Sequence, residues 1–430
     1  MSGGCKSAPP LEVGFAPTSF AVMQEILSRF PPTRTAALER LHRFAPKAGR
    51  DYAARRNYDL GRDAHSGVST LSPYLRARLV TESEVLDTVL NRHSPAAAEK
   101  FIQEVFWRTY WKGWLEMRPS IWGHYQASLK HCLDDVHTQS GLRDQWAAAC
   151  KGETDIACFN AWAQELAQTG YLHNHARMWF ASIWIFTLRL PWELGADFFL
   201  RHLLDGDPAS NTLGWRWVAG IQTSGKTYLA RTSNISKFTE GRFAPKWQLA
   251  GDAVAIKGPE NPPPMGLHDL DSPDPTARTG LILHDEDLSP GFILDGGITP
   301  VTTAALTARD ALSPLAIAPH VSGFADDATQ DSVTRFGARL GDVSPSLKTA
   351  QDLARWAQEA GLEQIVTPYA PVGPVADILR ALGDTDGVPP LRMIRRGYDS
   401  AAWPHATHGF FRFKDKIPKL LGQMRSLTTA

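Results

Sequence analysis

The strongest constraint on the fold is a change in sequence pattern near residue 250. Before it, apolar residues recur at three- and four-residue spacing, which is the period of an amphipathic helix. Clear examples are residues 33–44, 96–115 and 159–170. No convincing strand pattern lies between residues 20 and 220. We therefore predict an all-α domain over residues 1–250.

The second half of the chain alternates between two patterns. Residues 251–279 are rich in proline, as linkers are, and we predict a linker there. After it, short apolar segments alternate with helical ones, which indicates a parallel α/β sheet. We therefore predict a small Rossmann-like α/β domain over residues 280–430, so that the chain is all-α plus α/β. The expected strands are 279–288, 313–323, 362–370 and 389–399, and the expected helices are 330–341, 347–361 and 375–383.

Length and composition limit the number of domains and the kind of partner that this protein can have. A chain of 430 residues has room for two or three domains. Lys plus Arg and Asp plus Glu both number 45, so a nucleic-acid partner would need a local basic patch. The 14 tryptophans are a high number that needs a reason.

Cysteine spacing and hydropathy give three further expectations. The four cysteines form no C-x-x-C pair, which argues against a zinc site or a disulfide framework. The N-terminus lacks the apolar core of a signal peptide. The most apolar run, residues 178–188, is too short to span a bilayer. We therefore expect a cytoplasmic protein without a metal or a membrane partner.

Four motifs in the helical half together suggest a buried flavin site. A Ser/Thr-rich turn at 68–72 suits a pyrophosphate, and Arg108 and Arg177 suit a phosphate or a reduced flavin ring. Asp205 and Asp207 suit flavin N–H groups or ribose hydroxyls, although their D-G-D sequence equally suits a loop or a helix cap. The motifs are YAARRN (52–57) with SGVSTLSPYL (66–75), IQEVFWRTYW (102–111), TGYLHNHARMWFAS (169–182) and DGDPASNTLGWRW (205–217).

In this order the motifs resemble those of the DNA photolyase/cryptochrome family, most of all the cyclobutane pyrimidine dimer photolyases. The resemblance covers about residues 30–245 and implies a non-covalent FAD folded into a U shape. It places Asn211 beside flavin N5. Residues matching those that hold the FAD phosphates and ribose are Tyr52, Val68, Ser69, Thr70, Leu71 and Ser72, and those around the ring are Arg108, Asn174, Arg177, Asp205 and Asp207.

The resemblance also implies a pocket for a pyrimidine dimer flipped out of DNA. Glu104 matches the carboxyl group that hydrogen-bonds the dimer, and Trp107 and Trp217 match the aromatic walls. Asn174 and Met178 stand where (6-4) photolyases have histidines, so the pocket resembles that of enzymes for cyclobutane dimers.

The tryptophan relay that photoreduces flavin is matched in part. Trp215 and Trp192 correspond to its inner two members, and with Glu104 and Asn211 they complete the expected catalytic set. No tryptophan stands at the matching distal position. The remaining candidates, which would otherwise be core residues, are Trp146, Trp162, Trp179 and Trp184.

Photolyases carry an α/β antenna domain before the helical domain, whereas here the α/β segment follows it. Residues 398–421 are similar to the exit segment of that antenna domain, so we expect swapped domain order. A generic α/β domain stays open. The sequence leaves open whether this domain binds a folate, a deazaflavin or no pigment. Where the family often has an arginine after H-N, this chain has His175, which weakens a phosphate contact.

Three functions follow from these patterns. Light-driven repair of DNA containing pyrimidine dimers, by a monomer, is the leading one. A cryptochrome-like photoreceptor with the same FAD is the alternative. The third is a nucleotide triphosphatase, because GIQTSGKT (220–227) fits the phosphate-loop pattern. No apolar strand precedes this stretch and no helical stripe follows it, so Lys226 is better interpreted as a DNA phosphate contact or a solvated lysine.

Overall fold

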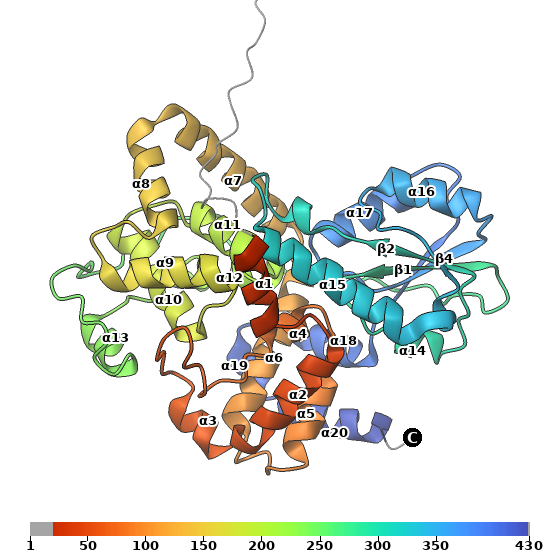
Figure 1. Cartoon of the computed structure of the whole chain (residues 1–430), viewed down its shortest axis with the longest axis horizontal. Coiled ribbons are helices and arrows are strands. Elements are labelled where there is room, and N and C mark those ends of the chain that lie inside the picture. Colours follow the sequence, from red (N-terminus) through yellow and green to blue (C-terminus); the bar gives the residue numbers. More distant parts are fainter. Residues whose placement is uncertain (1–19, 429–430) are drawn as a thin grey trace, which may run out of the picture.

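The computed structural model describes residues 20–428. Its first part is helical and has no strand between residues 20 and 220, as predicted (Figure 1). The three most periodic segments form α2, α6 and α9. The α-helices of this part are α1 (Phe20–Arg29), α2 (Arg34–Phe44), α3 (Arg50–Arg55), α4 (Ser72–Arg76), α5 (Glu82–Leu90), α6 (Glu99–Glu116), α7 (Ser120–Thr138), α8 (Ser140–Lys151), α9 (Ala157–Thr169), α10 (Asn174–Ser182), α11 (Trp192–His202), α12 (Pro208–Val218) and α13 (Thr232–Phe238).

A five-stranded parallel sheet follows, with strand order β3-β2-β1-β4-β5. Chain order reverses between β1 and β4, as in doubly wound folds. Neighbouring residues of β1 point to opposite faces. Leu281 packs on the side of α14 and α15, and Ile282 on the side of α16 and α17. The elements are β1 (Thr279–His284), α14 (Gly291–Leu294), β2 (Thr302–Leu306), α15 (Pro319–Phe336), β3 (Asp342–Val343), α16 (Ala350–Glu359), β4 (Gln364–Pro368), α17 (Pro374–Gly383) and β5 (Leu391–Ile394).

The strand predicted at 313–323 is wrong. Pro319 is the first residue of α15, and Ala318 before it is extended with φ −61° and ψ 133°, because a residue that precedes proline avoids the helical region. The strand next to β1 is instead β2, which sequence analysis missed. Its sequence TTAAL offers no long apolar run, and it is buried because the sheet is covered on both faces.

The end of the chain returns to the helical part. Helices α18 (Gly397–Ala402), α19 (Phe410–Lys414) and α20 (Ile417–Thr428) lie around α2, α5 and α6 (Figure 1). Trp403 packs so closely on α6 that a Cβ at Gly113 would lie 2.8 Å from the Trp403 ring atom Cδ1. The first and last thirds of the chain therefore share one hydrophobic core.

The proline-rich segment crosses the surface of the helical part. Residues 251–274 contain neither helix nor strand. The backbone N–H of Ile256 donates to Ala219 O at 3.0 Å, and that of Met265 donates to Met117 O at 2.9 Å. The segment is thus attached along its length. The domain boundaries at 250 and 280 remain predictions.

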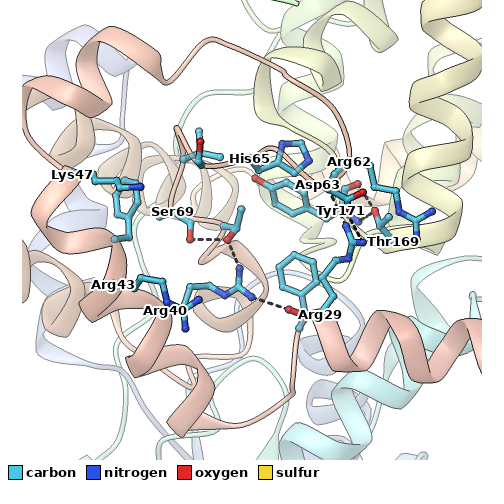
Figure 2. Close-up of a pocket in the computed structure, with 15 residues that line it drawn as sticks. Arg29, Arg40, Arg43, Lys47, Arg62, Asp63, His65, Ser69, Thr169 and Tyr171 are labelled. Carbon is cyan, nitrogen blue, oxygen red and sulfur yellow. Dashed lines mark hydrogen bonds and ion pairs between the residues drawn. The ribbon is translucent and has the colours of Figure 1, made fainter.

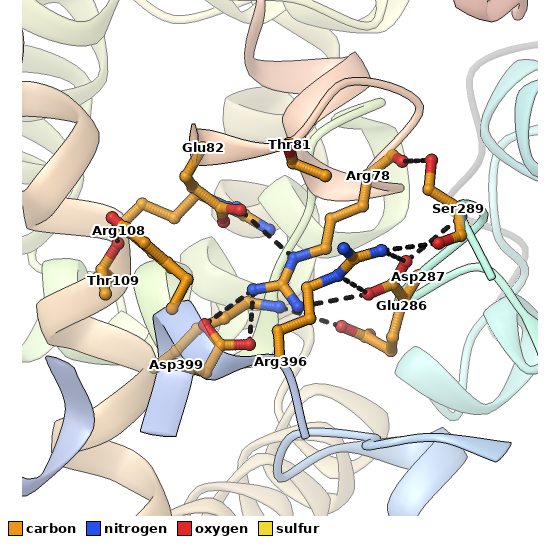
Figure 3. A network of polar contacts seen from close by, with 12 residues as sticks. Arg78, Thr81, Glu82, Arg108, Thr109, Glu286, Asp287, Ser289, Arg396 and Asp399 are labelled. Carbon is orange, nitrogen blue, oxygen red and sulfur yellow. Dashed lines mark hydrogen bonds and ion pairs between the residues drawn. The ribbon is translucent and has the colours of Figure 1, made fainter. Parts of the chain in front are cut away.

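Buried ion pairs join the sheet to the helices (Figure 3). Arg78 contacts Glu82 at 3.2 Å, Asp287 at 3.3 Å and Asp399 at 2.8 Å. Arg396 contacts Asp287 at 2.6 Å. Every side chain in this cluster except Arg396 is at most 5% exposed. Each carboxylate is stable in its buried place only while an arginine neutralises it.

A buried carboxyl group at the same junction predicts a pH dependence. Burial raises the pKa of Glu116 to about 7, although Tyr369 and the Val372 N–H donate to it. Between its ordinary pKa and 7 the folded state binds a proton that the unfolded chain has lost, so stability falls as pH rises through this range. In the wild type we expect the free energy of unfolding to fall by about 3 kcal/mol across this range. Glu116→Gln should abolish this fall. Urea unfolding at pH 5 and pH 7.5 measures it; parallel pH dependence in both proteins would contradict the assignment.

Candidate FAD site and lesion pocket

A pocket of about 430 Å³ opens beside the Ser/Thr-rich turn (Figure 2). Val68, Ser69 and Thr70 line it. Thr70 has φ 50°, a left-handed conformation uncommon for a residue with a side chain. Its hydroxyl accepts a hydrogen bond of 2.5 Å from Arg40. A left-handed residue beside the right-handed Leu71 turns successive backbone N–H groups to one side, which suits an anion.

Five cationic side chains surround this turn, against a single carboxylate from Asp63. Such an excess of positive charge suits a pyrophosphate. Sequence analysis missed these residues. The signal was the spacing of Arg40, Arg43 and Lys47 at three and four residues, which places them on one face of α2 and the turn after it. The five cations are Arg29, Arg40, Arg43, Lys47 and Arg62.

Four of the predicted ring ligands form two ion pairs at the D-G-D turn, and one of these pairs lies beside the same pocket. Arg177 of α10 binds Asp205 at 2.9 Å, and its guanidinium lies 5.7 Å from the ring centre of Tyr171, which lines the pocket. Arg108 of α6 contacts Asp207 at 3.4 Å. Helices α6 and α10 and the turn before α12 therefore bring four residues together that lie up to 99 positions apart in the sequence.

Asp207 is a helix cap, which is one of the two interpretations of the D-G-D sequence. Its side chain accepts from the N–H groups of Ala209 and Ser210 at the start of α12. Burial raises the pKa of Asp207, but the cations Lys112, Arg108 and Arg76 outweigh burial and hold the pKa well below its usual range. The carboxylate is therefore ionised.

Several buried polar atoms at this site have no hydrogen-bond partner within the described residues. They include Nε and Nη2 of Arg108 and Oδ1 of Asp205. An unpaired buried donor or acceptor costs about 1–3 kcal/mol. The set contains both donors and an acceptor, so the residues present fit the mixed polar edge of a flavin ring.

The two tryptophans predicted as inner relay members lie on α11 and α12. Trp215 is buried and rests on the backbone of α11 at Gly195, where a Cβ would lie 2.3 Å from its ring atom Cη2. Asn211, one turn earlier, donates to Ala196 O at 2.9 Å. Trp192 contacts Tyr125, with ring centres 5.7 Å apart. The two tryptophans thus occupy the same helix pair.

The candidates for the distal relay position are all fully buried. Trp184 has its ring centre 6.2 Å from that of Trp215, and Trp162 stacks on Trp179 at 5.4 Å. Trp146 has no exposed surface. Many of the tryptophans are therefore core residues of the helical part.

The residues of the predicted lesion pocket are engaged with other side chains. Glu104 forms an ion pair with Arg56, and burial raises the pKa of Glu104 although Arg56 opposes the shift. Trp107 stacks on Phe410 of α19, with ring centres 3.6 Å apart. Trp217 stacks on Tyr228 at 5.7 Å.

The remaining predicted site residues differ in exposure. Asn174 is exposed at the start of α10, and Met178 one turn later is half-buried. Tyr52 and Leu71 are core residues, and Ser72 begins α4. The roles of these residues stay predictions.

Part of the helical region matches a known family. Residues 101–248 match the family described as the FAD binding domain of DNA photolyase. This segment is therefore similar to a photolyase-type FAD-binding domain. The match begins at α6 and runs beyond α13, so it contains Arg108, Arg177 and the D-G-D turn.

Several known proteins are similar to parts of this chain. A deoxyribodipyrimidine photo-lyase of Alkalihalophilus pseudofirmus is 30% identical over 45% of this chain and 39% of its own length. The Escherichia coli one is 27% identical over 57% of this chain and 51% of its own length. A class III photolyase structure from Agrobacterium tumefaciens matches 52% of this chain and 46% of its own, at 26% identity and TM-score 0.44. The chain thus spans about half the length of these relatives or less.

Two other classes of site find no support in the described part of the chain. No group of three His, Cys, Asp or Glu side chains there is arranged to hold a metal ion. No helix there combines the length and apolar character needed to cross a bilayer. The GIQTSGKT stretch follows helix α12, not a strand, and residues 226–231, at its end and just after it, form no helix. It therefore lacks the setting of a phosphate loop.

Proposed function

We propose that this protein is an FAD-dependent, light-driven repair enzyme for cyclobutane pyrimidine dimers in DNA. The observation that carries the proposal is a pair of candidate half-sites within and beside the FAD-binding domain. One is the cation-lined turn at Thr70, which suits a pyrophosphate. The other is the group of unpaired polar atoms on Arg108 and Asp205, which suits a flavin ring.

In this proposal the chain's own residues bind the FAD, orient its ring and shield it from water. Arg40 holds the strained turn at Thr70 for the pyrophosphate. Arg108, Arg177 and the two aspartates hold the ring, and the buried Trp215 excludes water on the side of α11. The chemistry supplied by a bound, reduced FAD is donation of an electron to the dimer after excitation by light.

The dimer itself would lie against Glu104, Trp107 and Trp217. A lesion is badly stacked in the duplex, so flipping it out costs less than flipping a normal base. Stacking on an aromatic side chain contributes about 1–3 kcal/mol per base. Displacement of Arg56 from Glu104 would free the carboxyl group to hydrogen-bond the dimer.

Glu104→Ala tests the assignment of the lesion pocket. We expect the rate of dimer repair to fall by about tenfold or more, because a hydrogen bond to a charged group contributes about 1.5–3 kcal/mol, while FAD stays bound. Photorepair of a dimer-containing oligonucleotide and the flavin absorbance measure the two effects. Glu99→Ala, on the exposed side of the same helix and paired with Lys414, is the control. Loss of FAD from Glu104→Ala would show that the residue is misplaced.

A cryptochrome-like photoreceptor is the second candidate. The stacking of Phe410 over Trp107 and the zero formal net charge favour it, since both weaken capture of a DNA lesion. Light-driven reduction of bound FAD without any repair would select this function.

The α/β part, in our proposal, is an antenna-like domain whose position in the chain is swapped. Its strand order is that of a doubly wound fold, and α18 to α20 after it pack on α6. Whether a folate or a deazaflavin accompanies the FAD is decided by the absorbance of the purified protein.

A further inference from the structure

The sheet turns its usual ligand-binding edge toward the FAD-binding domain. In doubly wound folds, ligands bind outside the carboxyl ends of the strands, where the strand order reverses. Here the residues that follow β1 at this edge are Asp285, Glu286 and Asp287, and none is more than 4% exposed. Three carboxyl groups in such a place need a reason.

Two of these carboxyl groups act on the back of the D-G-D turn. The carbonyl of Gly206, between the two aspartates of that turn, accepts hydrogen bonds from Arg76 Nε at 2.8 Å and Arg309 Nη1 at 3.3 Å. Glu286 contacts Arg76 at 2.5 Å, and Asp285 contacts Arg309 at 2.5 Å. Carboxylates of the α/β part therefore fix the two arginines that hydrogen-bond to the D-G-D turn.

Glu286 and Asp207 also share their cations. Lys112 contacts Glu286 at 3.1 Å. Lys112 and Arg76 both lower the pKa of Asp207, and both lower the pKa of Glu286 against the effect of its burial. The two carboxylates thus share the same two cations. A change of charge on Glu286 consequently alters how much positive potential Lys112 and Arg76 direct at the flavin side of the cluster.

We propose that Glu286 is a positioning residue of the flavin site, through which the α/β part fixes the D-G-D turn and sets the electrostatic potential at the ring. The inference rests on the proposed function, because it requires bound FAD. In this inference the carboxyl edge of the sheet supports the neighbouring FAD site.

Opposite charge changes at two partners give the test. Glu286→Gln leaves Lys112 and Arg76 less neutralised, so it stabilises the additional negative charge of reduced flavin and raises the midpoint potential of bound FAD. Lys112→Met removes a cation and lowers the potential. The double variant restores the net charge and returns the potential to near the wild-type value. We expect each single change to alter the affinity ratio of reduced to oxidised FAD about tenfold, equivalent to about 30 mV for two electrons.

Spectroelectrochemical titration of the holoprotein measures these potentials, and thermal unfolding of the same samples checks their folding. Glu116→Gln, titrated below pH 6 together with the other variants, is the matched control, because Glu116 is a buried carboxyl at the same junction that burial keeps protonated below its pKa of about 7, so this change removes almost no charge near Lys112. Its potential should equal that of the wild type. If Glu286→Gln does not fold, Lys112→Met and the double variant carry the comparison.

Equal potentials in the wild type, Lys112→Met and Glu286→Gln, or shifts of the same sign in both single variants, would overturn the inference while FAD binding stands. Wild-type protein that binds no FAD would overturn the proposed function, and this inference with it.

Discussion

Arg78→Met is expected to lower the free energy of unfolding by about 3–5 kcal/mol, the usual cost of leaving buried charges unpaired. Arg78 contacts Glu82, Asp287 and Asp399 at once, and these come from three separate parts of the chain. Without Arg78, the ion pair left to Glu82 among the described residues is with Arg108 at 3.7 Å. Urea unfolding at neutral pH measures the change.

The control for this variant is Arg339→Met. Arg339 and Asp295 form a pair of similar length, 2.6 Å, but their side chains are 50% and 71% exposed. An exposed pair contributes about 0–1 kcal/mol, so this variant should be almost as stable as the wild type. Equal losses in the two variants would mean that the buried cluster does not hold the sheet to the helices.

Gly195→Ala is expected to cost about 1–3 kcal/mol, the range for inserting a methyl group into a packed core. The new Cβ would lie 2.3 Å from Cη2 of Trp215 and 3.0 Å from Cε2 of Trp184. Both rings are large and buried, so Trp215 must move away from α11. Because the rate of an electron hop depends steeply on separation, we also expect slower light-driven reduction of bound FAD.

Gly214→Ala is a matched control one residue before Trp215. Nothing lies within 4 Å of a Cβ at Gly214, and alanine in a helix is favoured over glycine by about 0.5–1 kcal/mol. This variant should be as stable as the wild type or more stable, with unchanged photoreduction. Comparison of both variants by thermal unfolding and by flavin absorbance under illumination separates a steric effect from a general effect of the substitution.

The helical part was predictable because its sequence pattern is local. The periodic segments at 33–44, 96–115 and 159–170 became helices close to the expected limits. The strand β2 was not predictable, because TTAAL is short and its burial comes from its neighbours in the sheet. Nor was the return of the C-terminal helices, since the contact of Trp403 with Gly113 joins residues far apart in the chain.

The candidate site was predictable to a similar degree. The order of the motifs indicated Arg108, Arg177 and the D-G-D turn, which the fold brings together. The cations of α2 were missed because a basic helix face has many uses, and only the tertiary structure places Arg40 against Thr70. The stacking of Phe410 on Trp107 was also missed, because it depends on where the end of the chain packs.

Light-driven repair of a defined dimer tests the central claim most directly. The holoprotein with reduced FAD is mixed with an oligonucleotide that contains one cyclobutane thymine dimer, and the restored thymines are counted after illumination or darkness. We predict repair that needs both FAD and light. Intact dimers after illumination, in protein whose FAD is bound and reduced, would contradict the account.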